Sequence, residues 1–137
     1  MVKVLGKKEI NLVPLSNLIE SMREVKDELE IDIIRKSVRL NEEVFQEVYA
    51  SHADYETEID LALAIEASMR RIGAEGPSFS TIVASGRNSA LPHAVPGRDK
   101  VERGSSLTID MGLVFNGYCS DMTRNFVVGK PDKRYQE

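Results

Sequence analysis

The chain has 137 residues and a mass of 15.3 kDa, the size of one domain able to bury about two-thirds of its unfolded surface. Hydrophobic residues make up 42% and charged residues 29%, which is typical of a globular chain, and the net charge is −4. Without a basic excess, nucleic acid is not expected as a partner, and no apolar run reaches the roughly 20 residues of a membrane span.

The N-terminal segment, residues 1–15, mixes apolar positions with a Gly6-Lys7-Lys8 break and predicts a short strand or hairpin that ends at Pro14. Residues 1–10 carry lysines but no apolar signal-peptide core. A single cysteine, Cys119, cannot form an internal disulfide and fits a reducing compartment. We therefore expect a cytoplasmic protein.

Three helices are predicted next. Residues 17–24 indicate a short helix, and the capping-box pattern of Asp27 and Glu30 predicts a long helix that follows it and ends near Ser51. Apolar residues at helical spacing predict the buried face of this long helix: Ile31, Ile34, Val38, Val44, Phe45 and Val48. Thr57 predicts the N-cap of a third helix, and Gly73 predicts its end. The buried stripe of the third helix is predicted to be Ile59, Leu61, Ala62, Ile65, Met69 and Ile72.

β-prone sequence begins after the helices. Residues 79–84 predict a strand, whereas residues 86–104, with three glycines and two prolines, show no period and are typical of a functional or disordered segment. Two further β-prone runs, 106–115 and 118–128, flank Asn116-Gly117, a strong signal for a type I′ hairpin turn. Helices followed by strands predict an α+β fold, an antiparallel sheet with helices on one face.

The two-residue turn fixes the register of the hairpin. Phe115 then faces Tyr118, Leu113 faces Ser120, Gly112 faces Asp121 and Asp110 faces Thr123. Alternation gives one apolar face, which the helices are expected to cover: Ile109, Met111, Leu113, Phe115, Tyr118, Met122, Phe126 and Val128.

Asp110 and Asp121 share the other face as diagonal neighbours, a separation of roughly 7–8 Å between Cα atoms. Aspartate is depleted in strands, so the pair needs an explanation. Two divalent cations bridged by carboxylates would explain it: Mn²⁺ or Mg²⁺ with oxygen ligands, Co²⁺ or Zn²⁺ if imidazole joins them. The alternative is the solvated side of a half-exposed sheet. Two carboxylates are too few for a tight site, so a metal centre requires further ligands.

The two histidines differ in their surroundings. His93 lies between Pro92 and Pro96, whose restricted backbones would hold the imidazole in place for proton transfer or for contact with a substrate carbonyl. The alternative for His93 is a solvated loop histidine. His52 lies near a helix C-terminus, where the dipole favours a cation, and is interpreted as structural. Cys119 falls on the aspartate face and is assigned no catalytic role.

Two segments carry a family resemblance. Residues 80–96 (STIVASGRNSALPHAVP) and 101–129 (VERGSSLTIDMGLVFNGYCSDMTRNFVVG) closely resemble the pita-bread metallopeptidases, the group of methionine aminopeptidase, Xaa-Pro aminopeptidase and Xaa-Pro dipeptidase (prolidase). Residues 22–37 resemble the start of the catalytic domain in the proline-specific branch. The most specific part is the aspartate pair with ten residues between, preceded by the Pro-His loop.

The resemblance implies a function and a set of site residues. Asp110 and Asp121 correspond to metal ligands, with Asp121 bridging two divalent ions, Mn or Co, and His93 corresponds to a catalytic histidine that contacts substrate and assists proton transfer. The implied reaction is hydrolysis of the bond before proline, by an aminopeptidase or a dipeptidase, in a peptide with proline at the second position. Hydrolysis would use water activated by the metal pair.

The resemblance also implies a domain organisation. Residues 1–15 would be the tail of a preceding N-terminal domain or a linker, and residues 16–137 the N-terminal half of a metallopeptidase catalytic domain. The family site also uses one histidine and two glutamates from the second half, whereas His52 and His93 both precede Asp121. We therefore expect an inactive fragment with low metal occupancy.

Two other interpretations stay open at this point. One is a non-catalytic pita-bread module that binds peptides, although both aspartates and the Pro-His histidine are retained. The other is a homodimer in which two half-domains pair edge to edge and bring four aspartates together across a twofold axis.

Overall fold

The computed structural model describes residues 13–131. The strand predicted for residues 1–15 falls mostly outside this range, and residues 13–15 have no regular structure. The helices are α2 (Leu18–Glu24), α3 (Glu28–Ser51) and α4 (Glu58–Arg71), with 3₁₀ helices η1 (His52–Asp54) and η2 (Gly86–Ala90). The strands are β1 (Gly76–Pro77), β2 (Ile82–Ser85), β3 (Ser106–Met111), β4 (Leu113–Phe115), β5 (Tyr118–Cys119) and β6 (Met122–Val127).

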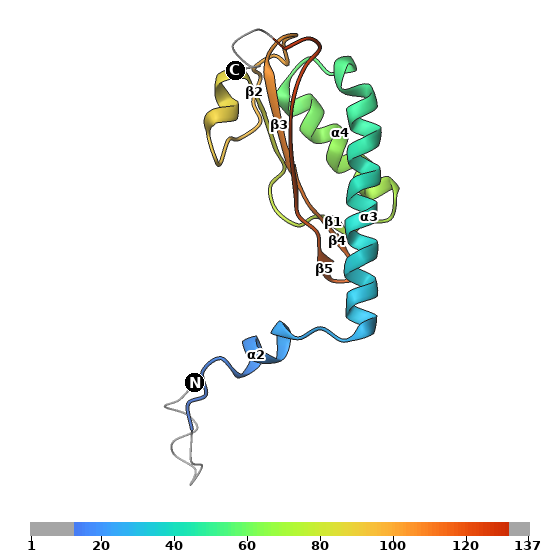
Figure 1. Cartoon of the computed structure of the whole chain (residues 1–137), viewed down its shortest axis with the longest axis vertical. Coiled ribbons are helices and arrows are strands. Elements are labelled where there is room, and N and C mark those ends of the chain that lie inside the picture. Colours follow the sequence, from blue (N-terminus) through green and yellow to red (C-terminus); the bar gives the residue numbers. More distant parts are fainter. Residues whose placement is uncertain (1–12, 132–137) are drawn as a thin grey trace.

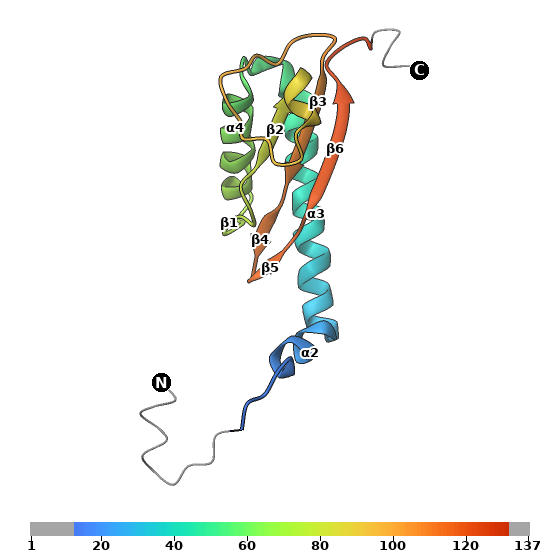
Figure 2. The same cartoon turned by 90° about the vertical axis from the view of Figure 1, so that its left-hand side faces the viewer.

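Helices and strands form two layers. In Figure 1 the strands are seen edge-on, with α3 and α4 against one face and the segment that contains η2 on the opposite side. Figure 2 looks onto that opposite, open face and shows α2 lying beyond the first turn of α3, away from the sheet. None of the helices in residues 13–131 is long and apolar enough to cross a lipid bilayer.

Local capping signals set the helix ends as predicted. Asp27 Oδ1 accepts a hydrogen bond from the Glu30 amide at 2.9 Å, and Glu30 Oε2 accepts one from the Asp27 amide at 2.8 Å, which completes the capping box of α3. Thr57 Oγ1 accepts from the Asp60 amide at the start of α4. After α4, Gly73 adopts a left-handed φ of 93°, a conformation that glycine tolerates best.

The buried face of α3 differs from the predicted one at one position. Val38 is 44% exposed, and its neighbour Ser37 is fully buried instead, together with Asn41. Ser37 Oγ donates to the carbonyl oxygens of Leu113 and Tyr118, and Asn41 Nδ2 donates to that of Met111 at 3.2 Å. The helix therefore turns two polar side chains toward sheet carbonyls that need donors, because buried carbonyl groups without partners are costly.

The hairpin has the predicted register. Phe115 pairs with Tyr118, and Asp110 pairs with Thr123. The turn residues Asn116 and Gly117 have φ values of 48° and 77°, as a type I′ turn requires. The strands form two antiparallel three-stranded sheets, in the orders β1-β4-β5 and β2-β3-β6, that follow one another along the hairpin.

Neither arm of the hairpin is the continuous strand that the sequence predicted. One arm is interrupted at Gly112 and the other at residues 120–121. A Cβ atom at Gly112 would lie 2.2 Å from the Ser120 carbonyl oxygen and 2.3 Å from Ser78 Oγ. The segment after β1 is inserted at this break, where the Ser78 amide donates to the Gly112 carbonyl and Ser78 Oγ donates to that of Ser120.

Two other β-region predictions need correction. The strand predicted for residues 79–84 is shifted, because β2 spans Ile82–Ser85 and residues 79–81 form the connection around the break. The aperiodic segment 86–104 begins with the short helix η2 and is otherwise irregular, as predicted.

The hydrophobic core lies between the two layers. It joins the inner sides of α3 and α4 to the predicted apolar face of the strands: Val44, Phe45, Val48, Leu61, Ala62, Ile65, Met69, Ala74, Val83, Leu107, Ile109, Met111, Leu113 and Val128. The fold is thus the α+β arrangement that the sequence predicted, with helices on one face of antiparallel strands.

Candidate metal centre

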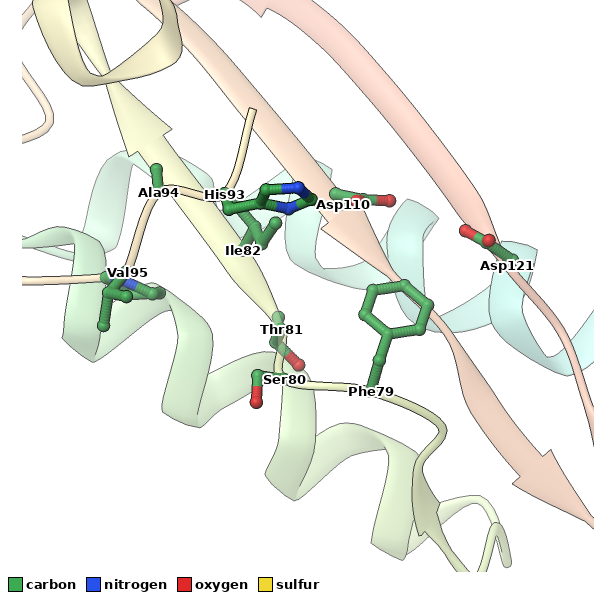
Figure 3. A pocket seen from close by; sticks show the side chains of 10 residues that line it. Phe79, Ser80, Thr81, Ile82, His93, Ala94, Val95, Asp110 and Asp121 are labelled. Atoms are coloured by element: carbon green, nitrogen blue, oxygen red, sulfur yellow. The ribbon is translucent and has the colours of Figure 1, made fainter. Parts of the chain in front are cut away.

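The three residues singled out in the sequence lie in one place on the open face. Asp110 is in β3, Asp121 lies between β5 and β6, and His93 belongs to the segment between η2 and β3. Figure 3 shows both carboxylates on the same side of the ribbon and directed toward one another, with the His93 ring on the other side of Asp110. The hairpin register produces this placement, because Asp110 and Asp121 are diagonal neighbours.

These side chains line a cavity of about 530 Å³. Its wall is made by the connection before β2 and by the Pro-His segment: Phe79, Ser80, Thr81, Ile82, His93, Ala94, Val95, Pro96, Asp110 and Asp121. The cavity therefore combines two carboxylates and an imidazole with apolar side chains, and Figure 3 shows the Phe79 ring beside the aspartates, as in many small-molecule sites.

Asp110 is oriented by its neighbour across the ladder. Thr123 Oγ1 donates a hydrogen bond of 2.7 Å to Asp110 Oδ1, and Ile82 pairs with Asp110 from the other side. Sequence reasoning placed Thr123 opposite Asp110 but gave it no role. The predicted register was the signal, because a hydroxyl opposite a carboxylate on one face is within hydrogen-bond reach.

The position of His93 is set by its backbone. The His93 side chain is exposed, and no hydrogen bond to its ring is found among residues 13–131. On either side of it, the Leu91 amide donates to the Asn88 carbonyl and the Ala94 amide to the Leu91 carbonyl, while Ala94 is buried. The segment is therefore an ordered one that presents an exposed imidazole to the cavity.

His52 and Cys119 lie apart from this cavity. His52 stacks on Tyr49 with ring centroids 5.4 Å apart and meets Phe126 edge-on, and its Nδ1 lies 2.5 Å from the Tyr49 carbonyl oxygen. These contacts fit the structural role predicted for His52. Cys119 is an exposed thiol and does not line the cavity.

Comparison with known proteins places the chain in a family. Residues 32–137 match metallopeptidase family M24. The chain belongs to that family. This M24 chain is 37% identical over 123 residues to an Xaa-Pro dipeptidase of Pyrococcus furiosus, a match that covers 90% of the chain and 35% of the relative. It is 36% identical over 129 residues to an uncharacterized peptidase of Bacillus subtilis, with coverage of 94% and 36%.

Solved structures confirm the fold. An X-Pro aminopeptidase from Thermotoga maritima superposes with a TM-score of 0.84 at 39% identity, over 89% of the M24 chain and 35% of that protein. An Xaa-Pro dipeptidase from Bacillus anthracis gives 0.85 at 34% identity, with coverage of 93% and 36%. The predicted pita-bread resemblance is therefore confirmed. The chain spans about a third of the length of the relatives that it matches.

The donor set of the M24 chain fits part of a site for divalent ions. Two carboxylates that face one another, one of them already oriented by Thr123, offer the hard oxygen ligands that Mn²⁺ and Mg²⁺ favour. Within residues 13–131, however, no three or more His, Cys, Asp or Glu side chains are grouped so that they could hold a metal ion. The described residues therefore offer two carboxylates on one side of the cavity, fewer donors than a tight metal site needs.

Proposed function

We propose that this chain contributes part of the active site of a two-metal exopeptidase that hydrolyses the bond before proline, as an aminopeptidase or a dipeptidase. The observation that carries the proposal is that Asp110, Asp121 and His93 line one cavity in a chain of family M24. The names of the relatives support proline specificity, because they include Xaa-Pro dipeptidases and an X-Pro aminopeptidase.

Each site residue has a role in the proposal. Asp110 and Asp121 would hold two divalent ions, Mn or Co. Bound ions supply a water nucleophile at neutral pH and polarise the scissile carbonyl group. Thr123 keeps the Asp110 carboxylate in a fixed orientation. His93 contacts the substrate and carries a proton, for which an imidazole is suited near neutral pH. Phe79 and Val95, which line the cavity, offer apolar contacts to the peptide.

The proposal includes the organisation of the whole protein. Residues 16–137 are the N-terminal half of the catalytic domain, residues 1–15 the end of a preceding domain or a linker, and one histidine and two glutamates from a further segment complete the ligands. The 137-residue chain alone then has no more than trace peptidase activity. A cytoplasmic location and the pairing of two copies stay predictions, the latter tested by sedimentation at high concentration.

The first test reads the coding sequence beyond Glu137 and assays the protein that it encodes. With Mn²⁺, this protein should cleave Xaa-Pro dipeptides or longer Xaa-Pro peptides and leave matched Xaa-Ala peptides largely intact. Asp121→Asn should lower kcat/KM at least about a thousandfold, because metal ligation is lost. Asp54→Asn, an exposed carboxylate in η1, is the matched control and should keep full activity.

Several outcomes would contradict the proposal. Full activity of Asp121→Asn, or activity that survives chelation of metal, would show that the aspartates are not the metal ligands assigned here. Equal cleavage of Xaa-Ala and Xaa-Pro peptides would refute the proposed proline specificity but not the proposed metal ligands. Substantial hydrolysis by the purified 137-residue chain would show that its site does not need ligands from a further segment.

A further inference from the structure

Glu58, the first residue of α4, has a carboxylate that is almost completely buried. The residue is 1% exposed. A buried carboxylate is costly unless hydrogen bonds replace its water. Glu58 Oε1 accepts from the Ser85 amide at 2.7 Å and from Asn88 Nδ2 at 3.0 Å, and Glu58 Oε2 accepts from the Gly97 amide at 3.1 Å. The N-terminus of α4 adds a favourable dipole. Both oxygens are therefore used.

The donors come from the two ends of one segment. Ser85 ends β2 immediately before residues 86–96, and Gly97 follows them directly. His93 lies within this segment, which Figure 2 shows in front of the open face of the sheet. One carboxylate thus closes, at both ends, the segment that presents the candidate histidine.

Backbone contacts reinforce the same attachment. The Ile59 amide donates to the Gly97 carbonyl, and the Glu58 amide donates to that of Asp99, both at 3.0 Å. Asn88 Nδ2 also donates to Asp99 Oδ2 at 2.7 Å. Hydrogen bonds to the N-terminus of α4 therefore hold residues 97–99 in place. Since the ring of His93 has no hydrogen bond within residues 13–131, its position relative to the aspartates depends on the backbone of this segment and on the contacts that hold the segment.

A carboxylate suits this place better than its isosteric amide. Glutamine has one acceptor oxygen and an NH₂ group that only donates. Whichever way the amide of Glu58→Gln is turned, its NH₂ group faces either the Gly97 amide or the pair formed by Ser85 and Asn88. One attachment is therefore lost, although the side chain keeps its size.

We propose that Glu58 is a positioning residue that fixes His93 against Asp110 and Asp121 by closing the segment 86–96 at both ends. Its importance for hydrolysis rests on the function proposed above. The attachment itself does not, because it is made within this chain and needs neither metal nor substrate.

The test uses nuclear magnetic resonance of the metal-free 137-residue chain. The only two histidines are His52 and His93, so the imidazole spectrum holds one reporter and one internal reference. In Glu58→Gln the His93 signal should shift or broaden while that of His52 stays in place. Exchange of the amide hydrogen that faces the new NH₂ group, that of Gly97 or that of Ser85, should accelerate at least about tenfold, because its hydrogen bond to the side chain is lost.

Two further variants separate positioning from general stability. Ile65→Val shortens a buried side chain of the same helix away from the segment, and should leave the His93 signal unchanged. Asn88→Ala removes one donor to Oε1 and should move the His93 signal in the same direction by a smaller amount; it also serves if Glu58→Gln does not fold.

The proposal is overturned if the His93 signal and the exchange of both the Ser85 and Gly97 amides are as in the wild type in Glu58→Gln, and the His93 signal is also unchanged in Asn88→Ala. It is also overturned if the His52 signal changes in Glu58→Gln as strongly as the His93 signal does. The same holds if Ile65→Val changes the His93 signal as strongly as Glu58→Gln does. Failure of the peptidase assay with an intact His93 response would instead remove the proposed function and leave the attachment standing.

Discussion

The two faces of the β3–β6 pair are held in place by different interactions. On the face toward the helices, Ile109 and Met111 are completely buried in the core. On the open face, Asp110 is partly exposed, Asp121 and Thr123 are exposed, and the contacts are hydrogen bonds such as that from Thr123 to Asp110. Packing thus explains the residues of the covered face. The two neighbouring carboxylates on the open face have no such explanation from packing.

The polar groups of the two faces sharpen this contrast. On the covered side Ser37 and Asn41 are buried, and each donates to a strand carbonyl near the break at Gly112. Their polarity satisfies the backbone. Asp121, in contrast, is exposed beside the cavity, where its carboxylate faces that of Asp110. Polarity therefore serves the fold on one side of the sheet and is available for binding on the other.

The largest expected difference is between two neighbours in β3. Met111→Ala should lower the free energy of unfolding by about 2–5 kcal/mol, because it leaves a cavity in the core. Asp110→Ala should change it by no more than about 0.5 kcal/mol, because only an exposed hydrogen bond is lost. Urea unfolding followed by circular dichroism measures both. Comparable losses of unfolding free energy in the two variants would show that side chains of the open face also stabilise the fold.

The junction between the two sheets should give the next largest effect. Gly112→Ala places a methyl group against the Ser120 carbonyl, Ser78 Oγ and the Phe79 ring, and should cost about 3 kcal/mol through overpacking. Gly97→Ala is the control, since its Cβ would meet Glu58 Oε2 only at 3.9 Å, an ordinary contact. We expect a change within about 0.5 kcal/mol there. Thermal unfolding of both variants measures the difference in stability. Equal stability of Gly112→Ala and the wild type would show that the backbone does not approach Gly112 as closely as described.

Local rules in the sequence were sufficient for the helix ends and the hairpin register. Asp27 with Glu30, Thr57 and Asn116-Gly117 act within a few residues of themselves, so their effects could be predicted directly. The alternation of side chains then followed from the register. The hairpin register alone is therefore sufficient to predict that Asp110 and Asp121 lie on one face.

Contacts between distant residues account for what the sequence did not predict. The break at Gly112 depends on the approach of Ser78, 34 positions earlier, and burial of Asn41 depends on the carbonyl of Met111. The role of Glu58 has no local signal in the sequence, because its donors at Ser85 and Gly97 lie 27 and 39 residues away. These partners come together only in the tertiary fold, so local sequence patterns do not predict them.

The smallest expected effect lies at the tip of the hairpin, where the covered face meets the first turn of α3. The Tyr118 hydroxyl donates to Glu30 Oε1 at 2.5 Å, and this bond, followed by that from the Asp27 amide, lowers the pKa of Glu30 below its ordinary value of 4.5. The same bond raises the pKa of Tyr118 above 10.0. A lowered carboxyl pKa means that the stabilisation by Glu30 is present above about pH 4.5 and is lost as the pH falls through the folded-state pKa.

Tyr118→Phe removes the larger of the two causes and keeps the aromatic ring. The pKa of Glu30, measured from the carboxyl ¹³C shift, should rise in this variant yet stay below 4.5, because the Asp27 amide still donates to the other oxygen. Glu47 provides the reference within the same spectrum. Its pKa is lowered by Ser68 and Arg71 on α4, which Tyr118→Phe does not touch. An unchanged Glu30 pKa, or an equal shift at Glu47, would mean that the hairpin tip is not joined to α3 by this bond.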